Sequence, residues 1–157
     1  MKKLIIGIAV IAIVLSATIL FRDEYSDYVD DYNVNSRLRR EENQDIVRVY
    51  QTKNDSFVYI VETEGYNPEL ILLVEVEQSE VKSLEIISHN ETDDYGGYAD
   101  NEWFLSRFLD KTVDKFELVK MKSDSKEQIV AVTGATFTSK AIVEAVNLCL
   151  ENYGGLK

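Results

Sequence analysis

An uncharged run over residues 4–21 limits most strongly what this chain can fold into. At about 1.5 Å of rise per residue, a helix over this run would be about 27 Å long, close to the thickness of a hydrocarbon core. Signal peptides have a shorter apolar region, of about 7–15 residues, before a small-residue cleavage site. Because Ser16-Ala17-Thr18 lies inside the run, the sequence predicts an uncleaved membrane anchor over residues 1–22, with a cleaved signal peptide as the alternative.

Charges on either side of this run predict its orientation. Lys2 and Lys3 precede it, which favours a cytoplasmic N-terminus, although Arg37, Arg39 and Arg40 reduce the charge asymmetry. Long domains are exported largely regardless of such charges. We therefore expect a single-pass protein of the cell membrane, with its soluble domain on the extracytoplasmic face.

The composition of the whole chain excludes several classes of function. The formal net charge is −11, which argues against a nucleic-acid partner, because that partner needs clustered Lys and Arg. Cys149 is the only cysteine and His89 the only histidine, so we expect neither a disulfide nor a metal site. No Ser-His-Asp, Cys-His or paired-carboxylate pattern indicates a hydrolase.

Periodicity predicts one α+β domain over residues 45–157, with a mainly antiparallel sheet packed by helices. Residues 23–44 are polar and are expected to form a linker or a helical stalk. Short polar connections predict an antiparallel meander of strands, at 46–50, 57–61, 70–76 and 82–88. Shorter strands are expected at 116–121 and 128–132, and helices at 102–109 and from Thr136 to Gly154-Gly155.

A strand meets a helix at Thr133-Gly134-Ala135-Thr136, and two more hydroxyls follow at Thr138 and Ser139. A helix N-terminus has unpaired N–H groups and a partial positive charge, so it suits a phosphate. Glycine lets the backbone turn sharply and approach a ligand closely. The same residue types also cap helices. These residues alone therefore leave both capping and phosphate binding open.

The motif resembles the (Ser/Thr)-Gly-Ala-Thr flavinylation motif of the FMN-binding domain family. That domain occurs in the G subunit of the Rnf electron-transport complex and in the C subunit of the sodium-translocating NADH:quinone reductase. The order of other segments is similar over about residues 57–150. Gly65-Tyr66-Asn67-Pro68 precedes strands, Glu91-Thr92 leads into a Gly96-Gly97 loop, and Trp103 follows in a short helix.

The resemblance implies a covalent flavin. In the family the last threonine of the motif, here Thr136, carries FMN through a phosphoester bond. A separate flavin transferase forms this bond from FAD and releases AMP. The other cofactor-binding residues that the resemblance implies are Thr133, Gly134 and Ala135 in the turn, Thr138 and Ser139 beside the phosphate, and Glu91 and Thr92 beside the flavin ring.

The expected function is a membrane-anchored electron carrier in an Rnf-type ion-translocating complex. Its expected partners are the membrane, the other membrane subunits of the complex and the flavin transferase. It would be an electron-transfer subunit of an oxidoreductase complex rather than a stand-alone enzyme. Two alternatives remain: a flavin-free binding or sensory module of the same fold, and a secreted flavoprotein of extracellular electron transfer.

Two segments differ from the family's pattern. The transferase's recognition pattern has an acidic residue three positions before the first hydroxyl of the motif; here that position is Val130, which favours the flavin-free alternative. Asp93-Asp94-Tyr95-Gly96-Gly97 replaces the family's Pro-Gly-Leu-Gly, and carboxylates near the ring are expected to lower its potential. Tyr95 and Tyr98 would either flank the flavin or cover this loop, and Trp103 is expected in the core.

Overall fold

The computed structural model describes residues 24–38 and 45–156, and the chain divides into two compact units, residues 1–31 and 32–157. The described part of the first unit contains helix α2 (Ser26–Val29) and the start of the 3-10 helix η1 (Asp30–Tyr32). The anchor predicted over residues 1–22 lies outside the described residues. Within the described ranges, no helix is long and apolar enough to cross a membrane.

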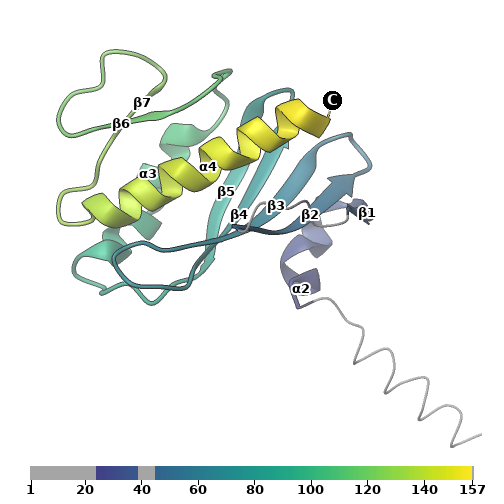
Figure 1. Cartoon of the computed structure of the whole chain (residues 1–157), viewed down its shortest axis with the longest axis horizontal. Coiled ribbons are helices and arrows are strands. Elements are labelled where there is room, and N and C mark those ends of the chain that lie inside the picture. Colours follow the sequence, from purple (N-terminus) through teal and green to yellow (C-terminus); the bar gives the residue numbers. More distant parts are fainter. Residues whose placement is uncertain (1–23, 39–44, 157) are drawn as a thin grey trace, which may run out of the picture. The chain divides into compact units, whose positions relative to one another are not determined.

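The second unit is built on a five-stranded sheet whose strand order follows the sequence (Figure 1). Every neighbouring pair is antiparallel, which confirms the predicted meander. One strand is additional, because β1 lies where the sequence predicts a linker or a helical stalk. The sequence of β1, Val-Asn-Ser-Arg-Leu, has three polar residues in succession, so it carries no run of β-prone residues. The strands are β1 (Val34–Leu38), β2 (Ile46–Thr52), β3 (Phe57–Thr63), β4 (Leu70–Glu77) and β5 (Glu80–Ser88).

The core lies between this sheet and helix α4 (Thr136–Leu156), drawn in yellow in Figure 1. Tyr59 of β3 and Leu72 of β4 are fully buried there, as are Ile142, Val146 and Cys149 on the predicted apolar stripe of the helix. Burying such side chains stabilises the fold by about 1.5–3 kcal/mol each. The helix therefore has a fixed position on β3, β4 and β5.

The C-terminal end of α4 differs from the prediction. The sequence places the end of the helix at Gly154-Gly155, whereas α4 continues through both glycines to Leu156. Glycine in a helix costs about 0.5–1 kcal/mol relative to alanine. Tertiary contacts offset this cost: Tyr153 is buried and its hydroxyl accepts a hydrogen bond from the Gln78 N–H (2.8 Å), while Leu156 packs against the core.

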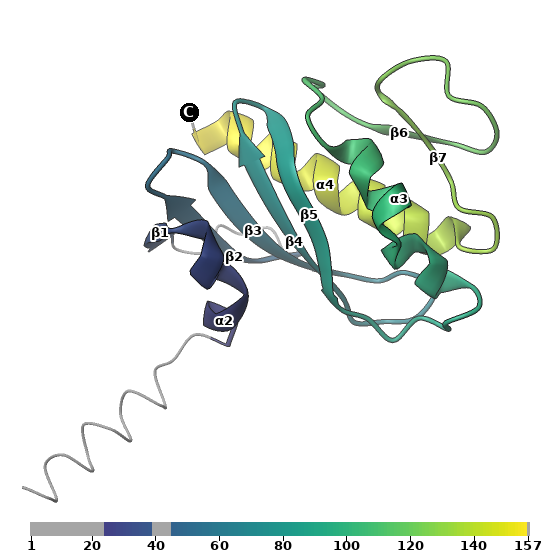
Figure 2. The ribbon, with the colours of Figure 1, turned by 180° about the vertical axis from the view of Figure 1, so that it is seen from behind.

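Short elements connect the sheet to α4, and Figure 2 shows them from behind. Three of them, η2 (Gly96–Asp100), α3 (Glu102–Leu105) and η3 (Ser106–Phe108), follow the sheet, so the helix predicted over 102–109 is divided in two. Strands β6 (Glu117–Val119) and β7 (Gln128–Val130) then pair in parallel. The side chain of Asn147 on α4 accepts the Phe116 N–H (2.7 Å) and donates to the Phe116 carbonyl (2.9 Å). This link ties the chain before β6 to α4.

Candidate functional site

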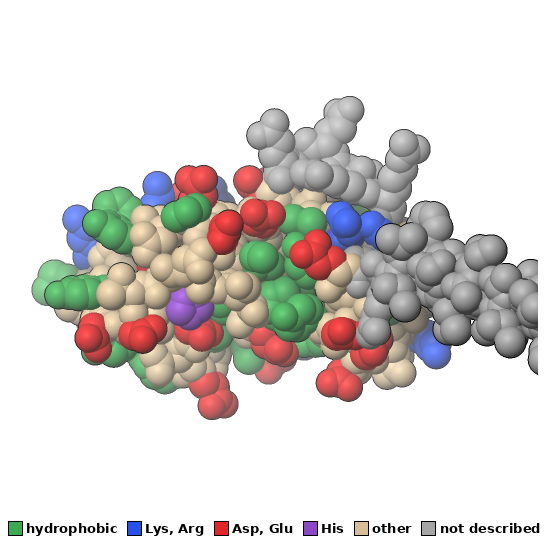
Figure 3. All heavy atoms as spheres, turned by 90° about the horizontal axis from the view of Figure 1, so that it is seen from below, with side chains coloured by type: hydrophobic (Ala, Val, Ile, Leu, Met, Phe, Trp, Pro, Cys, Tyr) green, Lys and Arg blue, Asp and Glu red, His purple; other side chains and the backbone are tan. Residues whose placement is uncertain are grey.

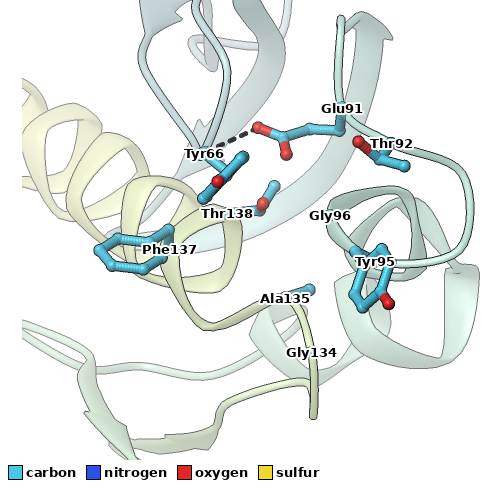
Figure 4. A pocket seen from close by; sticks show the side chains of 9 residues that line it. All are labelled: Tyr66, Glu91, Thr92, Tyr95, Gly96, Gly134, Ala135, Phe137 and Thr138. Carbon is cyan, nitrogen blue, oxygen red and sulfur yellow. Dashed lines mark hydrogen bonds between the residues drawn. The ribbon is translucent and has the colours of Figure 1, made fainter.

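A cavity of about 400 Å³ opens where three separate segments meet at the N-terminal end of α4 (Figure 4). The segments are the turn after β3, the loop after β5 and the first turn of α4. The volume lies within the range of small-molecule sites, about 300–1,000 Å³. Nine residues line the cavity: Tyr66, Glu91, Thr92, Tyr95, Gly96, Gly134, Ala135, Phe137 and Thr138.

The turn into α4 is held from inside by Ser139. Its buried hydroxyl donates to the Ala135 carbonyl (2.8 Å) and accepts the Val132 N–H (3.1 Å). Gly134 has φ +83°, a conformation that glycine adopts without strain, and a Cβ there would meet Tyr95 at 3.7 Å. The hydroxyl of Ser139 is thus bonded to the backbone, and Gly134 is needed for its positive φ rather than for space beside Tyr95.

The predicted hydroxyls separate into an exposed pair and a buried pair. Thr133 and Thr136 are exposed, and Thr136 is the first residue of α4. Neither lines the cavity, but Ala135 and Phe137, which flank Thr136, both do. Thr138 lines the cavity and is 1% exposed, and its Oγ1 has no hydrogen-bond partner among the described residues. A phosphate beside Thr136 would lie at the positive end of a helix of 21 residues.

Glu91 is the one buried charged side chain of the cavity wall, 7% exposed. Its Oε1 accepts the backbone N–H groups of Tyr66 (2.8 Å) and Asn67 (3.1 Å). Asn67 also donates from Nδ2 to the Asn90 carbonyl (2.8 Å). These three bonds join the turn after β3 to the loop after β5, two segments that the sequence separates by more than 20 residues.

The loop after β5 is closed by the backbone of Thr92. Its carbonyl accepts the N–H groups of Tyr95 (3.0 Å) and Gly97 (3.1 Å), and Thr92 itself lines the cavity. At the far side of the loop, His89 Nε2 lies 3.6 Å from an Asp100 carboxylate oxygen. Burial raises the pKa of Asp100 above its ordinary value, and His89 opposes this shift. Asp93 and Asp94 are exposed and do not line the cavity.

Four lining residues were not among the predicted site residues. Phe137 could have been found from the sequence, because it is an aromatic residue outside the apolar stripe of α4. In the structure it is 65% exposed. Tyr66 (72% exposed) lies 6.1 Å from it, between ring centroids. Tyr95 (62% exposed) flanks the cavity, as one of the two interpretations of that residue had it, and Gly96 also lines it.

Contrary to the expectation from the sequence, Trp103 does not lie in the core. Its side chain is half exposed, and the guanidinium of Arg107 lies 4.7 Å from the centre of its ring.

The face of the molecule that carries His89 is predominantly acidic. Figure 3 shows the face that carries His89, the only histidine, with many acidic side chains and few basic ones. Among the described residues, no group of three or more His, Cys, Asp or Glu side chains could hold a metal ion. The cavity itself offers a ligand the aromatic rings of its wall, the carboxylate of Glu91 as an acceptor and the hydroxyl of Thr138.

These residues fit a flavin. Tyr66, Tyr95 and Phe137 supply flat apolar surface for a planar ring system. Glu91 Oε2 and Thr138 Oγ1 are buried polar atoms without partners among the described residues. Such atoms cost free energy unless a ligand or water pairs with them.

Comparison with known proteins identifies the cofactor. The family model described as the FMN-binding domain matches residues 65–151. This range begins at the turn that Glu91 holds and ends within α4, so it includes all nine lining residues.

Two characterised relatives are the G subunits of ion-translocating redox complexes. The chain is 40% identical over 104 residues to the G subunit of the proton-translocating ferredoxin:NAD(+) oxidoreductase complex of Clostridium ljungdahlii, covering 64% of this chain and 56% of the relative. It is 33% identical over 136 residues to the G subunit of the Na(+)-translocating ferredoxin:NAD(+) oxidoreductase complex of Acetobacterium woodii, covering 81% and 65%. The chain thus spans less than two thirds of the length of either relative.

The fold is shared with a solved structure. NqrC of Shewanella oneidensis superposes with a TM-score of 0.54 at 16% identity, over 89% of this chain and 76% of that protein. From the family match over the whole cavity and the two relatives, we conclude that the chain belongs to the FMN-binding domain family and that its cofactor is FMN.

Proposed function

We propose that this protein is an electron-transfer subunit of an Rnf-type ferredoxin:NAD+ oxidoreductase complex, and that it carries FMN in ester linkage on Thr136. The observation that carries the linkage is the position of Thr136, exposed at the start of α4 between two residues that line the cavity. A hydroxyl there is accessible to a second enzyme. A flavin attached to it can reach the aromatic walls.

The attachment step is a phosphoryl transfer that requires FAD and a flavin transferase. The Thr136 oxygen forms a bond to the phosphorus nearest the ribityl chain, the bond from that phosphorus to AMP breaks, and the hydroxyl proton passes to a base. No electrons are exchanged in this step. The N-terminus of α4 favours the anionic phosphodiester that results.

Bound FMN would supply the capacity to accept and donate one or two electrons. The side chains of this protein hold the ring and limit its contact with water, with Tyr66, Tyr95 and Phe137 as the apolar walls. Thr138 offers a hydroxyl, and Glu91 a carboxylate oxygen, to the polar atoms of the ligand. The acidic face that carries His89 suits a neighbouring protein of the complex with a basic docking face.

Intact mass is the direct test of the linkage. The full chain is co-expressed with a flavin transferase in a host that exports it. We expect an added mass of one FMN less one water, with flavin fluorescence that survives denaturation. Thr136→Val is expected to abolish both signals, and the matched Thr133→Val variant to retain them. Flavin found on Thr133, or none on either, would contradict the linkage.

The second candidate is a flavin-free module of the same fold, and Val130 is the observation that favours it. Val130 ends β7, and its carbonyl accepts a hydrogen bond from Arg107 Nη1 (3.0 Å). Val130→Asp restores the acidic residue of the transferase pattern beside this guanidinium. We expect this variant to raise the flavinylated fraction. A wild-type chain that stays unmodified while Val130→Asp is modified would favour the flavin-free module.

We also propose that residues 1–22 anchor the protein, with the N-terminus in the cytoplasm and the domain outside. The support is the uncharged run over residues 4–21 and the two lysines before it. Membrane fractionation with N-terminal sequencing tests this. An intact N-terminus in the membrane fraction is expected, and a processed, soluble chain would favour the secreted flavoprotein.

A further inference from the structure

The two oxygens of the Glu91 carboxylate have different surroundings. Oε1 accepts two backbone N–H groups, from Tyr66 and Asn67, and these bonds fix the direction of the side chain. Oε2 is buried and has no partner among the described residues. A carboxylate oxygen can only accept hydrogen bonds, so the missing partner is a donor.

Two glycines enclose this carboxylate. A Cβ built on Gly65 would lie 2.1 Å from Oε1, and one built on Gly96 would lie 1.9 Å from Oε2. A side chain at either position would therefore force the Glu91 carboxylate to move. Both glycines have ordinary backbone conformations, since Gly134 is the only described glycine with positive φ. Their role is therefore to make room for the carboxylate beside the cavity.

The walls of the same cavity indicate which part of FMN faces Glu91. Tyr95 and Gly96 belong to the loop that Glu91 begins, and Tyr66 follows the glycine that lies against Oε1. Figure 4 shows the carboxylate between Tyr66 and the loop of Gly96. Flat apolar side chains suit the isoalloxazine ring rather than the hydroxylated ribityl chain. Oxidised isoalloxazine has a single ring N–H group, at N3 between two carbonyls.

We propose that Glu91 Oε2 accepts a hydrogen bond from the N3–H group of the flavin ring, and that Glu91 is the residue that positions the ring. The inference rests on the proposed function only in placing FMN in this cavity. It does not depend on the ester at Thr136. Glu91 thereby selects flavins with a free imide N–H. Its negative charge also disfavours the addition of electrons to the ring, which lowers the potential.

The first test compares FMN with 3-methyl-FMN, which lacks only the N3–H. Both are titrated, by fluorescence quenching, into the full chain carrying Thr136→Val, so that no ester can form. We expect FMN to bind at least tenfold more tightly than the methylated flavin. A preference below threefold, or no quenching by either flavin, would overturn the proposal.

The second test adds Glu91→Gln. The glutamine oxygen can replace Oε1 as the acceptor of the two N–H groups, and its NH2 then faces the cavity as a donor. We expect FMN affinity to fall at least tenfold and 3-methyl-FMN affinity to change less than threefold. An equal loss for both flavins would assign the contact to the ribityl chain and overturn the proposal.

The midpoint potential of the flavinylated protein gives an independent readout. We expect Glu91→Gln to raise it by more than Asp93→Asn, a matched removal of one negative charge on the exposed part of the same loop. An equal shift in the two variants would leave no special role for Glu91. The titrations use no covalent flavin, so failure of flavinylation and failure of this inference are distinguishable.

Discussion

Two regions of the molecule differ in burial and in hydrogen bonding. One is the core between the sheet and α4, and the other is the cavity at the start of α4. In the core, residues such as Leu72 and Val146 are fully buried, and their apolar contacts are made within the protein. Around the cavity the aromatic rings are exposed, and two buried polar atoms have no partner among the described residues. Among the described residues the core leaves the buried hydroxyl of Tyr59 without a partner, but its apolar contacts are made within the protein. The cavity wall instead has exposed aromatic rings and two unpaired polar atoms, which a ligand can contact.

The largest effect on the free energy of unfolding is expected from truncating a buried side chain of the core. Leu72→Ala is expected to lower the free energy of unfolding by about 2–5 kcal/mol, because it removes buried methyl groups and leaves a cavity. Urea denaturation measures this. The control is Met121→Ala at an exposed position (85% exposed), where we expect a change within about 0.5 kcal/mol. Equal losses in the two variants would contradict the assignment of Leu72 to the core.

Crowding the cavity wall should have the next largest effect. In Gly96→Ala the new methyl would lie 1.9 Å from Glu91 Oε2, so the carboxylate must move. We expect a loss of about 1–3 kcal/mol in stability and a fall in FMN affinity. Gly155→Ala, whose Cβ would lie within 4 Å of no described atom beyond its own stretch of helix, should instead stabilise slightly, by less than the roughly 0.5–1 kcal/mol of a mid-helix position, because Gly155 is next to the end of α4. Thermal unfolding and flavin titration of both variants check the opposite signs.

Ser139 lies between the core and the cavity, and we expect removal of its hydroxyl to lower the stability of the turn into α4. Ser139→Ala leaves the Val132 N–H without its acceptor, which should cost about 1–2 kcal/mol. Hydrogen exchange at Val132 and urea denaturation measure the loss. Ser106→Ala, at an exposed serine, serves as the control and should be nearly neutral. An unchanged exchange rate at Val132 in Ser139→Ala would show that the turn is held by other contacts.

The smallest expected effect is pH dependent and lies away from both regions. Burial raises the pKa of Tyr32 to about 12 from an ordinary value of 10.0, so the unfolded chain loses this proton first. The contribution of Tyr32 to stability should therefore be complete below about pH 10 and be lost as the pH rises towards 12. Burial also raises the pKa of Tyr59 and the pKa of Cys149, so the total alkaline loss of stability is larger than this contribution. Because Tyr32 is only partly buried, we expect less than about 1 kcal/mol.

The loss of unfolding free energy from pH 8 to pH 11, compared between wild type and Tyr32→Phe, measures the contribution of Tyr32. Tyr32→Phe should reduce the difference between the two pH values, although it also removes the hydrogen bonds to Ser83 (2.9 Å) and Glu85 (2.7 Å). The more exposed Tyr98→Phe is the matched control and should keep the difference. The same alkaline loss in Tyr32→Phe as in wild type would assign it to other groups.

Much of the sheet and of α4 could be predicted from the sequence, because their signals are local. Apolar runs in β2 to β5 and the stripe through Ile142 and Val146 mark the segments that supply the core, and β3 is buried over five successive residues. The Thr-Gly-Ala-Thr motif likewise marks the turn into α4, where Gly134 has positive φ. Strand β1 (Val-Asn-Ser-Arg-Leu) carries no such signal, because three successive polar residues interrupt it, and only its pairing with β2 identifies it as a strand.

The cavity could be predicted only in part. The family resemblance pointed to Glu91, Thr92 and Thr138, and all three line it. It could not show that Ser139 is occupied by the Ala135 carbonyl or that Phe137 faces outward, because burial on one side of a helix depends on what packs there.

The sequence by itself determined the strand pattern, the main helix and the chemistry available at its first turn, because these follow from short-range periodicity and residue type. Only the tertiary structure decided which polar atoms remain unpaired. Glu91 belongs to the loop after β5, yet its hydrogen-bond donors lie in the turn after β3 and its enclosing glycines are at 65 and 96. The pairing of a buried polar atom depends on every segment that reaches it in three dimensions.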